Sequence, residues 1–197
     1  MFKGTSASAG IGIGKAVIVE EAELVITRNE VADAEGEIQR FKGALEKTIA
    51  ATQKMADDLA SRVGEKEAEI MQGHMMLLSD PMLTGEIESS IRNDKVNSEF
   101  AIENVCNMYA DMFASMGDEL MQQRATDMRD IKVRMQRTLM GLESVDVSLL
   151  PKGSILVAKD LTPSMTAGIN PENVSGIVTE LGGKTSHSAI WVREVEF

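Results

Sequence analysis

The residue of this chain best suited to covalent chemistry is His187, in the stretch ELGGKTSHSAIWVR over residues 180–193. It falls in the first turn of a helix predicted to begin near Ser186. Backbone N–H groups in a first turn are unpaired, and the helix dipole is positive there. This setting favours the neutral, nucleophilic imidazole and offers donors to an anion. The position therefore predicts a histidine that accepts a phosphoryl group.

The neighbours of His187 have the types that such a transfer needs. Gly182 and Gly183 carry no side chains, so an incoming group could approach closely. Hydrogen bonds to phosphoryl oxygens could come from the hydroxyls of Thr185, Ser186 and Ser188. Lys184 could balance charge in the transition state. The residue types alone leave one alternative open, a structural histidine with only a local hydrogen bond.

Four other kinds of site are excluded by the order and spacing of residues. The GGKTS run resembles the end of a phosphate-binding loop, but Val178 stands where the first glycine is required. The GIGIG run over residues 10–14 precedes a strand, whereas a dinucleotide-binding loop follows one. Ser186 and His187 are adjacent and would point about 100° apart on a helix, so they cannot pair as nucleophile and base. The only other histidine, His74, is too isolated to complete a metal site.

Composition narrows the partners and the location. Asp and Glu outnumber Lys and Arg by 31 to 20, for a net charge of -11, which excludes a nucleic-acid footprint. Charge alone fits a basic protein partner and a merely soluble surface equally well. A single cysteine, Cys106, permits no intrachain disulfide, and its apolar surroundings predict burial. There is neither a signal peptide nor an apolar run of 18 residues, so we expect a cytoplasmic protein without membrane spans.

Helical periodicity dominates residues 32–142. The first helix carries one apolar stripe with a gap at Thr52; its members are Ile38, Phe41, Leu45, Ile49 and Met55. Another helix ends before Asp80, which caps the next one with Pro81 at its first position. We expect Asp130 and Arg134 to pair on a solvated helix face and most methionines to fill the core.

The sequence on both sides of this helical region predicts strands. KAVIVEE follows the N-terminal glycines, and SILVAK, LTPSMTAGI and GIVTE follow Val145 as strand, helix and strand, with Thr162 and Pro163 at the helix start. The order is typical of a parallel sheet. We therefore predict an α/β domain from residues 1–24 and 145–197, interrupted by an all-α bundle over residues 32–143. The last residues fall within a unit that should continue, so we expect a chain truncated on its carboxyl-terminal side.

The stretch GGKTSHSAIWVR resembles the phosphohistidine signature of phosphoenolpyruvate-utilising enzymes. The resemblance implies that His187 is phosphorylated through Nε2. It also implies that Thr166, in TPSMTA, hydrogen-bonds this histidine in the resting form. Trp191 departs from the usual aliphatic residue or methionine. Lys184 stands where many members have arginine, so the point charge of an ammonium group replaces the forked hydrogen-bond donors of a guanidinium group.

Further stretches resemble the Enzyme I family of the bacterial sugar phosphotransferase system: SASAGIGIGKAVIVEE, QGHMMLLSDPML, RATDMRDI and ILVAKDLTPSMTA, in that order. The resemblance implies a swivelling phosphohistidine domain with an inserted HPr-binding bundle. In this family the histidine takes a phosphoryl group from phosphoenolpyruvate and passes it to the carrier HPr for sugar uptake. A pyruvate phosphate dikinase or phosphoenolpyruvate synthase relative, and a nitrogen-related Enzyme I paralogue, are the alternatives.

The resemblance also implies partner and cofactor sites. HPr-binding positions carry over to a set on the predicted bundle: Glu65, Glu67, His74, Met76, Leu77, Leu83 and Arg124. Phosphoenolpyruvate, Mg²⁺ and the homodimer contact belong to a carboxyl-terminal barrel outside these residues. The chain itself is therefore expected to bind no metal, to be monomeric, and to exchange phosphate only with HPr.

Overall fold

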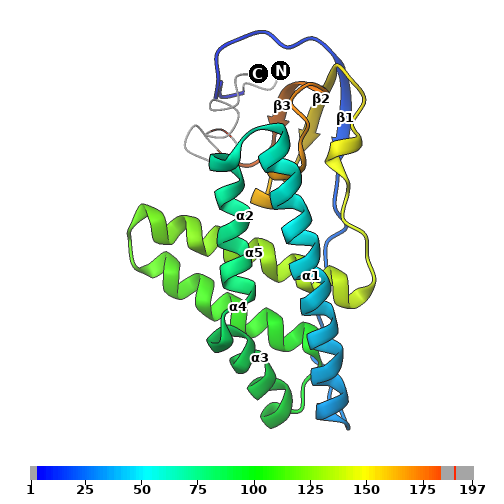
Figure 1. Ribbon diagram of the computed structural model, residues 1–197, viewed down its shortest axis with the longest axis vertical. Coiled ribbons are helices and arrows are strands. Elements are labelled where there is room, and N and C mark those ends of the chain that lie inside the picture. Colours follow the sequence, from blue (N-terminus) through cyan, green and yellow to red (C-terminus); the bar gives the residue numbers. More distant parts are fainter. Residues whose placement is uncertain (1–3, 183–188, 190–197) are drawn as a thin grey trace.

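The computed structural model describes residues 4–182 and Ala189, in which a helical bundle is inserted between strands of one small sheet. Figure 1 shows the bundle as the main body, with the sheet at one end of it. The helices are α1 (Ala34–Arg62), α2 (Glu65–Leu78), α3 (Pro81–Asp94), α4 (Ser98–Ser115), α5 (Glu119–Met140) and α6 (Pro163–Gly168), with a short 3₁₀ turn η1 at Val147–Leu149. None of the helices within residues 4–182 has the length and hydropathy needed to cross a membrane.

In the part of the chain that the structure describes, the sheet has three parallel strands in the order β1-β2-β3. They are β1 (Lys15–Val19), β2 (Ser154–Ala158) and β3 (Val174–Thr179). The inserted bundle separates β1 from β2 in the sequence, but the two strands pair directly. Their register runs from Lys15 opposite Ser154 to Val19 opposite Ala158. α6 connects β2 to β3, as expected of a strand–helix–strand unit. This arrangement confirms the predicted α/β fold with an inserted all-α bundle.

Two glycines of the N-terminal segment let the chain run close to this sheet. A β-carbon on Gly12 would lie 2.1 Å from the carbonyl oxygen of Ser175, and one on Gly14 would lie 2.0 Å from that of Gly153. Neither distance leaves room for a side chain. The GIGIG run thus provides close backbone approach to the sheet.

The buried stripe of α1 differs from the predicted one. Thr48 and Thr52 lie on the buried face, whereas Leu45 and Ile49 are only partly buried. Each threonine hydroxyl donates to the carbonyl four residues earlier, at 2.9 Å to Ala44 and 2.7 Å to Thr48. This bond satisfies the hydroxyl inside the bundle. The gap at Thr52 is therefore part of the packed face.

Local signals at the helix ends are confirmed. Asp80 accepts a hydrogen bond from Met82 N at 2.8 Å, with Pro81 at the first position of α3. The side chain of Thr162 accepts from Met165 N at the start of α6. At the end of α5, Gly141 adopts the left-handed conformation with φ 66°.

The bundle has a largely aliphatic core in which isoleucine is the commonest residue, and Cys106 is buried in it as expected. The prediction that most methionines fill the core is wrong. Met71, Met128 and Met135 are buried. The exposed methionines outnumber these three: Met76, Met82, Met108, Met112, Met116 and Met140. Periodicity marks an apolar face but does not say whether another element covers it.

Candidate functional site

The segments that follow β2 and β3 begin side by side. The N–H of Glu180 donates to Ala158 O at 3.1 Å, and that of Leu181 donates to Lys159 O at 2.8 Å. The first segment leads to α6 and Thr166, and the second leads to Gly182 and the stretch that contains His187. Carboxyl ends of neighbouring parallel strands are the usual place for sites in α/β sheets.

Thr166 is held rigidly in α6. It is 1% exposed, and its hydroxyl donates to Thr162 O at 2.7 Å, with Pro163 O at 3.1 Å. The single hydroxyl proton is therefore engaged within the helix, while the oxygen retains acceptor capacity. Helix geometry, more than a neighbouring loop, fixes this side chain.

Gly182 is the last residue of the described run and has a φ of 98°, a left-handed value that favours glycine. Gly183, Lys184, Thr185, Ser186 and His187 lie outside the described residues, as does the helix predicted to begin near Ser186. The contact between Thr166 and His187 therefore stays a prediction.

Side chains of the helical bundle form hydrogen bonds with both ends of α6. The carboxylate of Asp130 accepts from the N–H and from the hydroxyl of Ser164, each at 2.8 Å. At the other end, Arg62 donates to Ala167 O at 3.1 Å and to Ile169 O at 3.0 Å. These partners lie on α5 and α1, so side chains of two bundle helices hold the helix that carries Thr166.

The predicted solvated pair of Asp130 and Arg134 is wrong. Asp130 is 4% exposed, and Arg134 donates instead to Thr52 Oγ1 at 2.7 Å. Burial lowers the pKa of the Arg134 guanidinium from its ordinary value. Both side chains point into the interior because α1 and α6 pack against this part of α5.

His74 is also internal, with no exposed surface. Its Nε2 lies 3.2 Å from Oδ1 of Asp127, and its Nδ1 lies 3.9 Å from Oδ2 of Asp130. Leu83 is 2% exposed and belongs to the bundle core. In this structure neither His74 nor Leu83 is available for direct contact with a partner, because neighbouring helices cover both.

Other positions expected to bind a partner are accessible. Met76 on α2 is 72% exposed, Glu65 is exposed, and Leu77 is half-buried. The Arg124 side chain is one-third exposed, and its Nη1 lies 3.6 Å from Asp127. Glu67 belongs to α2, but its side chain lies outside the described residues.

Two residues that hold Arg124 in place were not predicted from the sequence. A β-carbon on Gly73 would lie 2.7 Å from Nη1 of Arg124, so the guanidinium lies across α2 where Gly73 has no side chain. Asp127 pairs with it from one turn further along α5. A glycine within a helix was the available signal for the first contact. No local pattern indicated the second.

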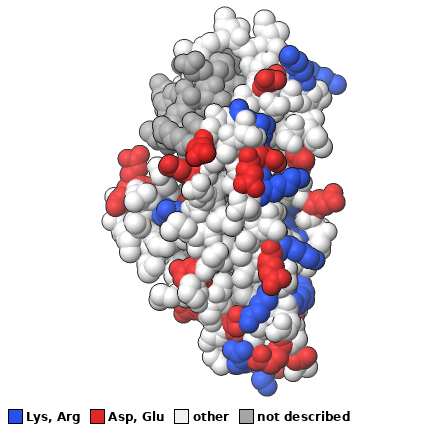
Figure 2. All heavy atoms as spheres, in the orientation of Figure 1, with Lys and Arg blue, Asp and Glu red and all other residues white. Residues whose placement is uncertain are grey.

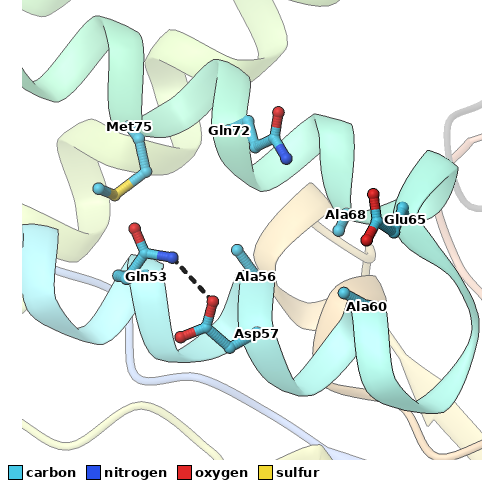
Figure 3. Close-up of a pocket in the computed structure, with 8 residues that line it drawn as sticks. All are labelled: Gln53, Ala56, Asp57, Ala60, Glu65, Ala68, Gln72 and Met75. Atoms are coloured by element: carbon cyan, nitrogen blue, oxygen red, sulfur yellow. Dashed lines mark hydrogen bonds between the residues drawn. The ribbon is translucent and has the colours of Figure 1, made fainter.

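An open groove runs between α1 and α2 beside Glu65 (Figure 3). Alanines 56, 60 and 68 line it together with Gln53, Asp57, Gln72 and Met75, and Gln53 donates to Asp57 at 2.8 Å. Of the positions expected to bind a partner, Glu65 alone is among the residues that line this groove, and the lining mixes apolar and polar side chains. Its two carboxylates, Asp57 and Glu65, suit a basic partner.

Charge is unevenly distributed on the face seen in Figure 2. Acidic and basic side chains are interspersed over α1, beside a largely uncharged stretch over α2. Within residues 4–182 and Ala189, no group of three or more His, Cys, Asp or Glu side chains is arranged to hold a metal ion.

Comparisons with known proteins agree with this architecture. The family model for the N-terminal region of PEP-utilising enzymes matches residues 3–124, and that for their mobile domain matches residues 150–197. Phosphoenolpyruvate-protein phosphotransferases of Listeria monocytogenes and Bacillus subtilis are 42% and 40% identical over 195 residues, or 99% of this chain. The chain spans 34% of the length of each relative.

Two solved structures are also similar. An NMR solution structure of Enzyme I has a TM-score of 0.88 and 37% identity, covering 100% of this chain and 80% of that one. The N-terminal domain of Enzyme 1-Nitrogen has a TM-score of 0.67 and 25% identity, covering 96% and 78%. The first is more similar by both measures. With family models covering both its bundle and its sheet region, the chain belongs to the PEP-utilising enzymes, in their Enzyme I branch.

Proposed function

We propose that this chain is the phosphohistidine-bearing part of a phosphoenolpyruvate-protein phosphotransferase. His187 accepts the phosphoryl group through Nε2 and passes it to HPr. Phosphoenolpyruvate and Mg²⁺ act in a carboxyl-terminal barrel outside residues 1–197, which also forms the homodimer. Residues 1–197 alone are a monomer that exchanges phosphate with HPr, and the protein works in the cytoplasm.

The observation that carries the proposal is the adjacency of the segments after β2 and β3. Hydrogen bonds from Glu180 and Leu181 to Ala158 and Lys159, at the end of β2, fix the two segments side by side. One segment bears Thr166 and the other continues into the GGKTSH signature. A site formed by two neighbouring loops at the carboxyl edge of a parallel sheet suits a residue that must meet a second protein.

The chemistry is a reversible exchange between two imidazoles. The P–N bond of the phosphorylated carrier breaks as a P–N bond to Nε2 of His187 forms, and the carrier's histidine leaves as an imidazole. Gly182 and Gly183 give the phosphoryl group access, while Lys184, Thr185 and Ser186 stabilise its charge.

The partner docks on the bundle near Met76. This side chain is an exposed apolar anchor. Arg124 adds positive charge at Gly73, three residues before it, and Glu65 adds negative charge at the start of the same helix. The net charge of -11 attracts a basic carrier and speeds the encounter. A dikinase-type relative would not bind HPr at this face.

Incubation with radiolabelled phospho-HPr tests the proposal. We expect acid-labile, base-stable label on the chain, mapped to His187 by peptide analysis. His187→Ala should remain folded and unlabelled, whereas Arg92→Ala, at an exposed position, should be labelled like the parent protein. Equal labelling of His187→Ala and the parent would exclude His187 as the acceptor.

A further inference from the structure

We propose that Asp130 is a positioning residue for this phosphoryl transfer, because it holds α6, and with it Thr166, against the bundle. The inference rests on the proposed function. Asp130 itself touches neither the carrier nor the phosphoryl group in this scheme. It acts through Ser164, two residues before Thr166.

α6 depends on outside partners because it is short. It has six residues, fewer than a helix needs to be stable by itself. Its first N–H groups and last carbonyls have no partners within the helix. The side chain of Thr162 satisfies one of these groups, the N–H of Met165. The bundle supplies Asp130 for the N–H of Ser164 and Arg62 for the carbonyls of Ala167 and Ile169.

The two bundle contacts have the signs that a helix dipole requires. Asp130 brings negative charge to the positive end of α6, and Arg62 brings positive charge to the negative end. Asp130 makes two hydrogen bonds with α6, and Arg62 makes one with α6 and one with the residue that caps its end. Such charge-assisted bonds are stronger than neutral ones. The paired contacts fix both the position of α6 and its direction.

Of the two contacts, the one made by Asp130 is the more rigid. Its side chain is 4% exposed, and both of its oxygens bind Ser164, which is 6% exposed. On its other side, Nδ1 of His74 faces Oδ2 at 3.9 Å. Asp127, in turn, orients His74 through Nε2. Asp130 is therefore confined from two sides, whereas Arg62 comes from the end of α1 and is exposed.

The structure shows which variants separate positioning from general stability. Asp130→Ala removes both contacts to Ser164. Asp130→Asn can restore them in neutral form, since its oxygen accepts from the N–H and its amide donates to the hydroxyl oxygen. Ser164→Ala removes only the hydroxyl bond. Glu35→Ala, at an exposed ion pair with Arg92, is the matched control.

The test measures phosphate exchange with HPr at saturating and at limiting carrier, at a temperature where all variants are folded. We expect Asp130→Ala to lower the saturated rate at least about 10-fold, because small misplacements of reacting groups are costly. The carrier concentration at half-maximal rate should change little. Asp130→Asn should recover most of the rate, and adding Ser164→Ala to Asp130→Ala should lower the rate no further.

A second measurement does not depend on catalysis. Residual dipolar couplings of backbone amides should report a changed or more variable orientation of α6 relative to α1–α5 in Asp130→Ala, but not in Glu35→Ala. An unchanged orientation, or a saturated rate equal to that of the parent, would overturn the role of Asp130. If the parent protein itself fails to exchange phosphate, the proposed function fails, and the couplings still decide whether Asp130 holds α6.

Discussion

The guanidinium of Arg124 lies across α2 at Gly73, where an added β-carbon would come within 2.7 Å of Nη1. The close contact ties α5 to α2 three residues before the exposed Met76. Because the neighbour is the far end of a flexible side chain, Arg124 can move away from a larger residue.

The first prediction concerns Gly73→Ala. The variant should be at least as stable as the parent protein, since alanine favours a helix by about 1 kcal/mol over glycine. It should nevertheless bind HPr more weakly, because Arg124 is displaced from the proposed docking face. Isothermal titration with HPr measures the affinity, and urea unfolding measures the stability. Gly85→Ala, on the exposed side of α3 with open space around it, is the control and should leave binding unchanged.

The second prediction compares two glycines in opposite settings. Gly14→Ala should destabilise the protein by at least about 2 kcal/mol, because its β-carbon meets the backbone oxygen of Gly153 at 2.0 Å. Gly43→Ala, within α1 and with nothing inside 4 Å, should stabilise it by about 0.5–1 kcal/mol. Chemical denaturation of both variants measures the change in the free energy of unfolding, which should be negative for Gly14→Ala and positive for Gly43→Ala. Equal effects would show that backbone approach at Gly14 is unimportant.

The third prediction concerns Arg137, which bonds to both segments that link the bundle to the sheet, one between β1 and α1 and the other between α5 and β2. Its Nη1 donates to Ala22 O at 3.1 Å, and its Nη2 donates to Glu143 O at 3.2 Å. Arg137→Met keeps much of the packing but loses both bonds. It should lower the free energy of unfolding by about 2–3 kcal/mol, because the side chain is buried.

Hydrogen exchange gives a local readout of the same change. In Arg137→Met, amides of residues 20–26 and 142–146 should exchange faster than those inside α4. Arg92→Met, which removes an exposed pair with Glu35, should cost far less stability and leave both connections protected.

The fourth prediction is a pH dependence from Cys106. Burial raises the pKa of its thiol to about 12, above the ordinary value of 9.0. Between these values the unfolded thiol loses its proton while the folded one keeps it, so stability falls as pH rises. The contribution to the slope is at most about 1.4 kcal/mol per pH unit.

Unfolding by urea at pH 8 to 11 measures this slope, and the difference from Cys106→Ala isolates the thiol from other groups. The parent protein should lose stability more steeply than the variant above pH 9. The native thiol should also resist alkylation at pH 8. Parallel curves for the two proteins would contradict a strongly shifted thiol.

Much of the fold followed from local rules. Periodicity predicted the helical region, the Asp80–Pro81 and Thr162–Pro163 pairs marked two helix starts, and β-branched runs gave strands. These signals succeed because helix caps and strand alternation depend on neighbouring residues. The GGKTSH stretch indicated the family for a different reason. It resembles a phosphohistidine signature, and such a site needs particular residue types in a fixed order.

Burial of polar residues could not be predicted in this way. His74, Asp130 and Ser164 are ordinary surface types, and Asp130 and Ser164 are 34 positions apart in the sequence, so no local pattern reveals their contact. In the sequence Thr52 interrupts an apolar stripe. In the structure its hydroxyl donates to the carbonyl of Thr48 within the helix, which allows the residue to be buried.

The sequence by itself determined the helices, the strands, the family and the histidine expected to carry phosphate. Only the tertiary structure decided which charged side chains bind α6, which methionines remain exposed, and which expected partner contacts are covered. The physical reason is that secondary structure depends on residues close in the chain. Burial and ion pairing depend instead on elements such as α5 and α6, which meet only when the bundle and the sheet fold together.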